Sequence, residues 1–197
     1  MTEKRWVPPA VPIPKAFDRF DSLVDSWFEE HLRGRPLVDV VMYAASALGD
    51  HGIIWVGLAG VQAARRARSG LPWQRRLTTT AAGLGIESAL VNGPVKWMFR
   101  RTRPVHEGPR PHSLRRPRTS SFPSGHATAA FFGAAILSEE DPMWAPLYYA
   151  VAVVVAASRI HVKIHHASDV TGGVLIGVVL GELGRRVLPL TVGEESR

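Results

Sequence analysis

The chain has 197 residues, enough for one domain with a sizeable core and short for two full domains. It carries 24 Lys and Arg against 17 Asp and Glu, a formal net charge of +7, which favours an anionic partner: nucleic acid, a membrane surface or a phosphorylated substrate. The absence of cysteine excludes a disulfide framework, a thiolate nucleophile and Cys-ligated zinc or iron–sulfur sites.

The first 15 residues contain four prolines, which predicts an irregular arm. No apolar run follows the charges of this arm, so no signal peptide is expected. Over residues 16–35, apolar side chains recur every three or four positions and acidic side chains lie between them. This pattern predicts an amphipathic helix that lies at a membrane interface or packs on a helical bundle.

Residues 36–190 are predicted to form one membrane-embedded domain, followed by a polar tail over 191–197. Five apolar segments with few charges predict about five transmembrane helices. The segments are Val40–Ala64, Leu77–Val95, Thr119–Ser138, Pro142–Ser158 and Val170–Gly181, the last extendable to Val187. Their small residues favour close packing in a membrane, although the shorter runs also fit buried helices of a soluble protein. The predicted fold class is therefore an all-α, polytopic membrane helical bundle with an N-terminal amphipathic helix.

The excess of positive charge is confined to one loop. Residues 96–118 hold eight basic side chains and one acidic side chain, and 8 minus 1 equals the net charge of the whole chain, +7. A nucleic-acid surface usually has a broader basic stripe with interleaved aromatic residues. We therefore expect no nucleic-acid partner, and a localised anion site instead.

This loop opens with the motif KWMFRRTRP, in which Lys96 and Arg103 are seven residues apart and Pro104 follows. A seven-residue step on a helix returns to nearly the same face, so both cations can reach one anion. Taken alone, the motif also fits juxtamembrane cations that extend to the membrane surface.

The second motif is SSFPSGHATAA, where Pro123, Ser124 and Gly125 form a turn before an apolar helix. The free N–H groups of a helix start and the Ser124 hydroxyl predict an anion cradle, and Gly125 lets an oxyanion approach closely. His126 follows as a candidate general acid. An ordinary Ser N-cap followed by a structural His is the alternative.

The third motif is SRIHVKIHHASDV, in which Arg159 can add a bidentate phosphate contact. His165 and Asp169 are four residues apart, so the carboxylate can hold one ring nitrogen and leave the other as a nucleophile. An isolated pair of this spacing is also common on protein surfaces. Together, the three motifs supply what phosphoryl transfer needs.

The order and spacing of these motifs resemble the type 2 phosphatidic acid phosphatase superfamily, from Lys96 to Asp169. That resemblance implies a metal-independent lipid phosphate phosphatase without a cofactor, in which His165 attacks phosphorus, Asp169 orients His165, and His126 protonates the leaving oxygen. A phosphohistidine intermediate is then hydrolysed. The implied phosphate ligands are Lys96, Arg103, Ser124, Gly125 and Arg159. Three further residues, His161, Lys163 and His166, match no fixed position of the family.

The implied substrates are undecaprenyl pyrophosphate, phosphatidic acid, phosphatidylglycerol phosphate or a decaprenylphosphoryl phosphoribose. Two alternatives stay open: a haloperoxidase with vanadate in the phosphate site, and a non-catalytic membrane protein that binds lipid. The expected location is the cell membrane, with membrane lipids around a multi-pass bundle, and the oligomeric state stays open. Five arginines between residues 65 and 76 predict a cytoplasmic face, which puts the active site on the extracytoplasmic side.

Overall fold

A computed structural model describes residues 14–106, 110–112, 114 and 119–187. This part of the chain is all-helical and contains no β-strand, which confirms the predicted fold class at that level. The α-helices are α1 (Ala16–His31), α2 (Pro36–Leu48), α3 (Ile53–Arg68), α4 (Gln74–Leu90), α5 (Lys96–Met98), α6 (Gly125–Glu140), α7 (Ala145–His161) and α8 (Ala167–Val187). Short 3-10 turns cover Asp50–Gly52 and Pro142–Trp144, and a π-helical turn covers Val91–Val95.

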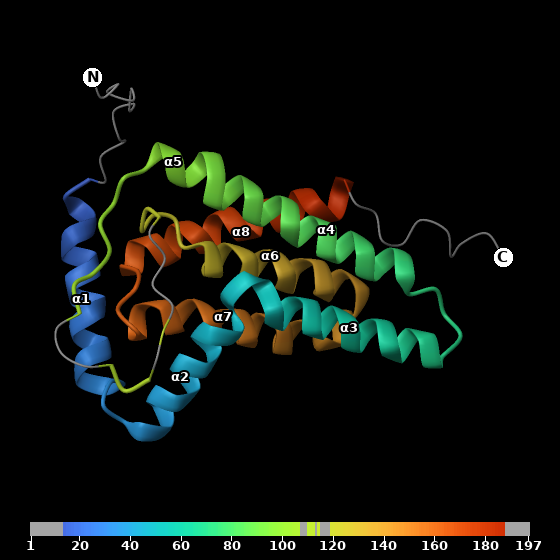
Figure 1. Ribbon diagram of the computed structural model, residues 1–197, viewed down its shortest axis with the longest axis horizontal. Helices are drawn as coiled ribbons and strands as arrows, with labels where there is room; N and C mark the ends of the chain where they lie inside the picture. Colours follow the sequence, from blue (N-terminus) through green and yellow to red (C-terminus); the bar gives the residue numbers. More distant parts are fainter. Residues whose placement is uncertain (1–13, 107–109, 113, 115–118, 188–197) are drawn as a thin grey trace, which may run out of the picture.

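Helices α3, α4, α6, α7 and α8 run roughly along the long axis of the molecule, whereas α1 lies across one end of this bundle (Figure 1). Helix α6 is central and packs against α4, α7 and α8. Glycines of α8 allow the closest approach: a Cβ on Gly173 or Gly177 would lie 2.5 Å from a backbone carbonyl oxygen of Ser124 or Thr128, respectively. Small residues facing a neighbouring helix are typical of membrane bundles, where backbones pack closely.

The predicted span Val40–Ala64 is not one straight helix. It divides into α2 and α3, which are bent by 67° around the turn Asp50–Gly52. His51 and Gly52 adopt positive φ values of 54° and 69°, which no α-helix accommodates. Apolar composition alone did not reveal this break.

Two helical segments, Pro142–His161 and Ala167–Val187, are long and apolar enough to cross a membrane, and the bent α2–α3 pair makes a third if it is one span. The expected number of about five spans is thus not confirmed. Helix α6 has only 16 residues, about 24 Å at 1.5 Å per residue, and does not begin at Thr119 as predicted. It begins at Gly125 because Ser124 has an extended backbone and caps the helix.

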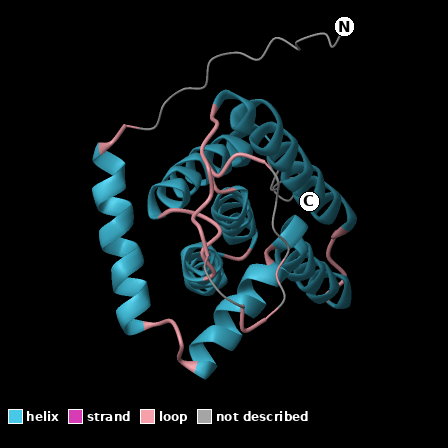
Figure 2. Ribbon diagram, turned by 60° about the vertical axis from the view of Figure 1, so that its left-hand side comes forward, coloured by secondary structure: helices cyan, strands magenta, loops and turns pink. Residues whose placement is uncertain are grey.

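Helix α1 is amphipathic and ends at His31, before Gly34 with its φ of 77° and before Pro36, which starts α2. Its apolar surface is divided between two environments. Phe28 is buried against the bundle, whereas Phe20, Leu23 and Trp27 are 43%, 63% and 50% exposed. Helix α1 lies along one side of the bundle (Figure 2), and its exposed apolar residues form an apolar strip on its surface.

Candidate active site

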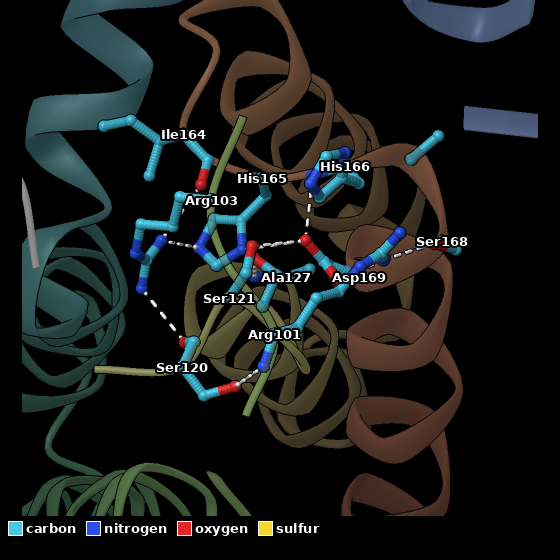
Figure 3. Close-up of polar contacts among 12 residues, drawn as sticks. Arg101, Arg103, Ser120, Ser121, Ala127, Ile164, His165, His166, Ser168 and Asp169 are labelled. Carbon is cyan, nitrogen blue, oxygen red and sulfur yellow. Dashed lines mark hydrogen bonds and ion pairs between the residues drawn. The ribbon is translucent and has the colours of Figure 1, made fainter. Parts of the chain in front are cut away.

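The site lies at the end of the bundle where α7 ends and α8 begins. His165 occupies the turn between these helices and is 2% exposed. Arg103, from the extended segment after α5, approaches one side of its ring, and Asp169, from the first turn of α8, lies on the other (Figure 3).

The two ring nitrogens of His165 have different neighbours. Nε2 lies 3.0 Å from Nη1 of Arg103, and Nδ1 lies 3.7 Å from Oδ2 of Asp169. A guanidinium can only donate, so Nε2 accepts this hydrogen bond and the ring proton belongs on Nδ1, facing the carboxylate. Burial lowers the pKa of His165 well below its usual range, and the charges of Arg159 and Arg103 add to this effect against the opposing influence of Asp169. The ring is therefore neutral at pH 7, with its lone pair on Nε2.

Asp169 is fully buried and held by three donors. Its carboxylate accepts hydrogen bonds from Ser121 Oγ at 2.5 Å, from the His166 backbone N–H at 2.8 Å and from Arg101 Nη1 at 2.6 Å (Figure 3). These contacts fix the carboxylate next to His165. Sequence reasoning missed Ser121 and Arg101, although Arg101 was among the basic residues of the charged loop.

Three cations belong to the site: Arg103, Lys96 and Arg159. Lys96 at the start of α5 is 7% exposed, and Arg159 in the last turn of α7 is 1% exposed. Burial lowers the pKa of Lys96 to about 8, and repulsion from Arg103 and Arg159 contributes to the shift, so these cations influence one another.

Only some of the N–H groups of Arg103 and Arg159 donate hydrogen bonds to other described residues. Arg159 Nη1 donates to the hydroxyl and carbonyl oxygens of Ser46, and Arg103 donates to the carbonyl oxygens of Ile164, Thr119 and Ser120. Within the described residues, Arg159 Nε and Nη2 and Arg103 Nε are buried without a hydrogen-bond partner. Buried donors are rarely left unpaired, so these N–H groups are suited to an anionic ligand.

Ser124, Gly125 and His126 begin α6 beside the cations. The Ser124 hydroxyl accepts a hydrogen bond from the Ala127 N–H at 3.4 Å, and the Ser124 N–H donates to the Asp169 carbonyl at 3.0 Å, which ties the starts of α6 and α8 together. Ser124 thus serves as the N-cap that was considered as the alternative, and it does so inside the site. A Cβ on Gly125 would lie 2.8 Å from Oδ1 of Asn92, so the close neighbour of this glycine in the structure is an amide.

His126 Nε2 lies 3.1 Å from Oδ1 of Asp50, at the bend between α2 and α3. Sequence reasoning missed this pair and the nearby Asn92. Asp50 was nevertheless detectable as the only formal charge in an apolar run of 25 residues, because a carboxylate there needs a partner inside the bundle.

An open cavity of about 1030 Å³ adjoins these residues. Lys96 and Arg103 supply charge to its lining, while Pro94, Trp97 and Phe99 supply apolar surface. His165 does not line the cavity but contacts Arg103, which does. Such a mixed lining suits a ligand with an anionic head and an apolar tail. No group of three or more potential metal ligands occurs in the described part of the chain.

Comparison with known proteins gives consistent matches. Residues 76–190 match the family model of the PAP2 superfamily. The chain is 34% identical to lipid A 1-phosphatase of Porphyromonas gingivalis over 57% of this chain and 24% of that protein, so it spans about a quarter of that relative. It is 30% identical to decaprenylphosphoryl-5-phosphoribose phosphatase of Mycobacterium tuberculosis, over 76% of this chain and 80% of that protein. The fold is similar to a transmembrane PAP2-type phosphatidylglycerolphosphate phosphatase from Bacillus subtilis, with a TM-score of 0.64, 22% identity and coverage of 88% and 87% of the two chains.

Proposed function

The chain belongs to the PAP2 superfamily, and from this membership we propose that it is an integral-membrane phosphatase that hydrolyses a lipid phosphate, either a phosphomonoester or a pyrophosphate. The observation that carries the proposal is the set of buried, unpaired N–H groups on Arg103 and Arg159 next to Lys96. A tetrahedral phosphate offers acceptors to all of them.

In the proposed first step, the phosphate takes over the donors of Arg103 and frees Nε2 of His165. Nε2 attacks phosphorus, the N–P bond forms and the bond from phosphorus to the leaving oxygen breaks. His126 donates a proton to that oxygen, so a lipid alcohol or a lipid phosphate departs. Asp169 stabilises the positive charge that develops on the His165 ring, through the proton on Nδ1.

In the second step, His126, now neutral, removes a proton from water, and the resulting oxygen attacks the phosphohistidine. The N–P bond breaks, inorganic phosphate leaves and both histidines return to their starting states. Lys96, Arg103 and Arg159 stabilise the charge on the phosphoryl oxygens in both transition states, with Ser124 and the Gly125 N–H as further donors. No metal ion takes part in this scheme.

The lipid character of the substrate is supported by the apolar part of the cavity lining and by the relatives, whose names specify lipid A and a decaprenyl-linked phosphoribose. We propose that the site faces the extracytoplasmic side. The basic cluster of residues 65–76 lies around the loop between α3 and α4, at the opposite end of the bundle from the site (Figure 1). A basic cluster of this kind favours the cytoplasmic face.

The decisive experiment measures phosphate release by the detergent-solubilised protein from a panel of prenyl phosphates, prenyl pyrophosphates and glycerolipid phosphates. We expect turnover that resists chelators and is abolished in His165→Ala. His166→Ala is the matched control, because the ring of this neighbouring histidine lies 3.3 Å from the Thr102 carbonyl oxygen and has no role in the proposed steps. With a 32P-labelled substrate, the native protein should accumulate label that is stable to alkali and labile to acid, as a phosphohistidine is.

Two other results would replace the proposal. Vanadate-dependent oxidation of bromide, without phosphate release, would indicate a haloperoxidase. Lipid binding with no release after long incubation would indicate a non-catalytic membrane protein. Full activity of His165→Ala would refute the proposed role of His165 as the nucleophile.

A further inference from the structure

Two charged side chains that have no assigned role in the three motifs connect α1 to the site. Asp21, in the middle of α1, is 6% exposed, and Arg101 lies between Lys96 and Arg103 in sequence. Asp21 precedes the residues that match the family model, 76–190. The roles proposed above use neither residue.

Arg101 joins two carboxylates with one guanidinium. Its Nη1 donates to Asp169 Oδ1 and to Ser168 Oγ, both at 2.6 Å, and its Nη2 donates to Asp21 Oδ2 at 2.5 Å. The planar fork of an arginine can hold both partners at a fixed separation, which a lysine cannot do. Asp21 therefore fixes the plane of the group that holds Asp169.

Asp21 also contacts the start of α8 directly. Its Oδ1 accepts the Ser168 backbone N–H at 2.7 Å, and its Oδ2 accepts the Ser168 hydroxyl at 2.9 Å. A carboxylate at this position accepts a hydrogen bond from a free N–H at the start of α8 and interacts favourably with the dipole of that helix. The residue that Asp21 holds, Ser168, is the immediate neighbour of Asp169.

A second contact of α1 complements the first. Arg33, just after α1, donates to the carbonyl oxygens of Ile160 and His161 at the end of α7, at 2.8 and 2.9 Å. The negative side chain thus meets the start of α8 and the positive side chain meets the end of α7, the favourable orientation at both helix ends. The turn that carries His165 is held from both sides by α1.

We propose that Asp21 and Arg101 are positioning residues for the hydrolysis: they fix the carboxylate of Asp169, so that His165 keeps its proton on Nδ1 and presents Nε2 to phosphorus. This inference rests on the proposed function. It makes α1 a part of the active site, although the helix contributes no group that touches the phosphate.

The test compares Asp21→Asn, Arg101→Gln and the double variant with Asp18→Asn, a control on an exposed position of the same helix. We expect each single variant to lower kcat by about tenfold to 100-fold, the size typical of losing a partner that orients a reacting group. KM and inhibition by vanadate, a phosphate analogue, should stay within about threefold of the native values, because the phosphate ligands remain. The double variant should be no slower than the slower single variant, since both residues act on one carboxylate.

Binding of vanadate also shows whether each variant is folded. If Asp21→Asn and Arg101→Gln both lose vanadate inhibition as well as turnover, the two residues serve folding only, and this result would overturn the inference. Native kcat in Asp21→Asn would overturn it as well, while leaving the phosphatase proposal intact.

A readout independent of turnover separates the two proposals. Nitrogen-15 NMR of histidine-labelled protein, assigned with His165→Gln, reports which ring nitrogen carries the proton. We expect the Nδ1–H form in the native protein and in Asp18→Asn, and a mixture of forms in Asp21→Asn. An unchanged Nδ1–H form in Asp21→Asn would reject the positioning role, even if the native protein hydrolysed no lipid phosphate.

Discussion

The guanidinium of Arg103 occupies the nitrogen of His165 that is proposed to attack phosphorus: Nη1 donates to Nε2 over 3.0 Å. The Nε–H of the same arginine is buried without a hydrogen-bond partner among the described residues, and the side chain lines the open cavity. It therefore lies between the entry for a phosphate and the nucleophile, and a phosphate that takes its donors also releases the lone pair of the ring.

Replacing Arg103 should affect catalysis more strongly than replacing another arginine of the same loop. For Arg103→Gln we expect kcat/KM to fall about 100-fold to 1000-fold, as when one preorganised donor to a transition-state oxygen is lost. Arg103→Lys should recover little of the lost kcat/KM, because a lysine ammonium lacks the planar, forked donors of a guanidinium. Arg110→Gln is the matched control, since Arg110 donates to the carbonyl oxygens of Val162 and Lys163. Steady-state kinetics measure both effects, and a loss below tenfold in Arg103→Gln would contradict this role.

The pKa of Lys96, lowered to about 8, predicts a basic limb in the pH profile. The ammonium is charged below this pKa and loses its charge as the pH rises through it, so affinity for the phosphate should fall above pH 8 or so. The profile of kcat/KM, which reports the free enzyme, should show the decline. In Lys96→Arg the charge persists, and the limb should move beyond pH 9 or disappear. A native profile that stays flat from pH 7 to 9.5 would contradict the prediction.

The effect of replacing Asp50 on the hydrolysis rate should depend on the leaving group of the substrate. Burial lowers the pKa of His126 to about 4, and the carboxylate of Asp50, 3.1 Å from Nε2, opposes this shift, so Asp50→Asn removes a partner of the protonated ring. Hydrolysis of an alkyl phosphomonoester, whose leaving oxygen needs a proton, should slow about tenfold or more, whereas p-nitrophenyl phosphate should be little affected. Asp39→Asn is the control, because Asp39 forms a comparable pair, at 2.7 Å, with His161, a histidine that has no role in the proposed steps. Equal slowing of both substrates would argue against His126 as the acid.

The sidedness proposal can be tested with single cysteines, since the native chain has none. Val105→Cys, 79% exposed near the site, should react with an impermeant maleimide on intact cells. Ser69→Cys, exposed after the end of α3, should react only after permeabilisation. The reverse labelling pattern would put the active site in the cytoplasm.

Packing of α8 on α6 should be sensitive to a single methyl group. Gly177→Ala places a Cβ 2.5 Å from the Thr128 carbonyl oxygen, which belongs to the backbone and cannot move away cheaply. We expect a loss of about 1 to 3 kcal/mol in the free energy of unfolding. Gly85→Ala in α4, where nothing lies within 4 Å, should be neutral or stabilising by up to about 1 kcal/mol. Thermal unfolding in detergent measures the difference, and similar midpoints for the two variants would contradict it.

Much of the fold and the family could be predicted because the governing patterns are local. Runs of apolar residues predicted helices, and three motifs of fixed spacing predicted the superfamily, which the family match confirms. The turn at Asp50–Gly52 was missed because backbone geometry, and no change in hydropathy, interrupts that run. The number of spans is not confirmed, because a hydropathy pattern does not distinguish an apolar helix at the centre of the bundle, such as α6, from one that contacts lipid.

The residues that hold Asp169 and Ser168 in place could not be predicted from the sequence, for a different reason. Ser121, Arg101 and Asp21 contact Asp169 or its neighbour Ser168 from separations of 48 to 147 residues. No spacing rule relates positions so far apart. Only the fold shows that an acidic residue of an amphipathic helix, ordinary in its own sequence context, is one of the most buried carboxylates of the described chain.

The contact between Asp21 and Ser168 spans 147 residues, so it joins the first described helix, α1, to the last, α8. During synthesis, α1 emerges before α8, so its contact with Ser168 can form only after the helices between them have been made. Until then its exposed side chains Phe20, Leu23 and Trp27 present the kind of apolar surface that partitions to a lipid–water boundary. Asp169 arrives with α8, and only then can α1 close over the site. A chain truncated before α8 would therefore lack Asp169 as well as the contact that holds α1, so the last described helix completes the candidate site.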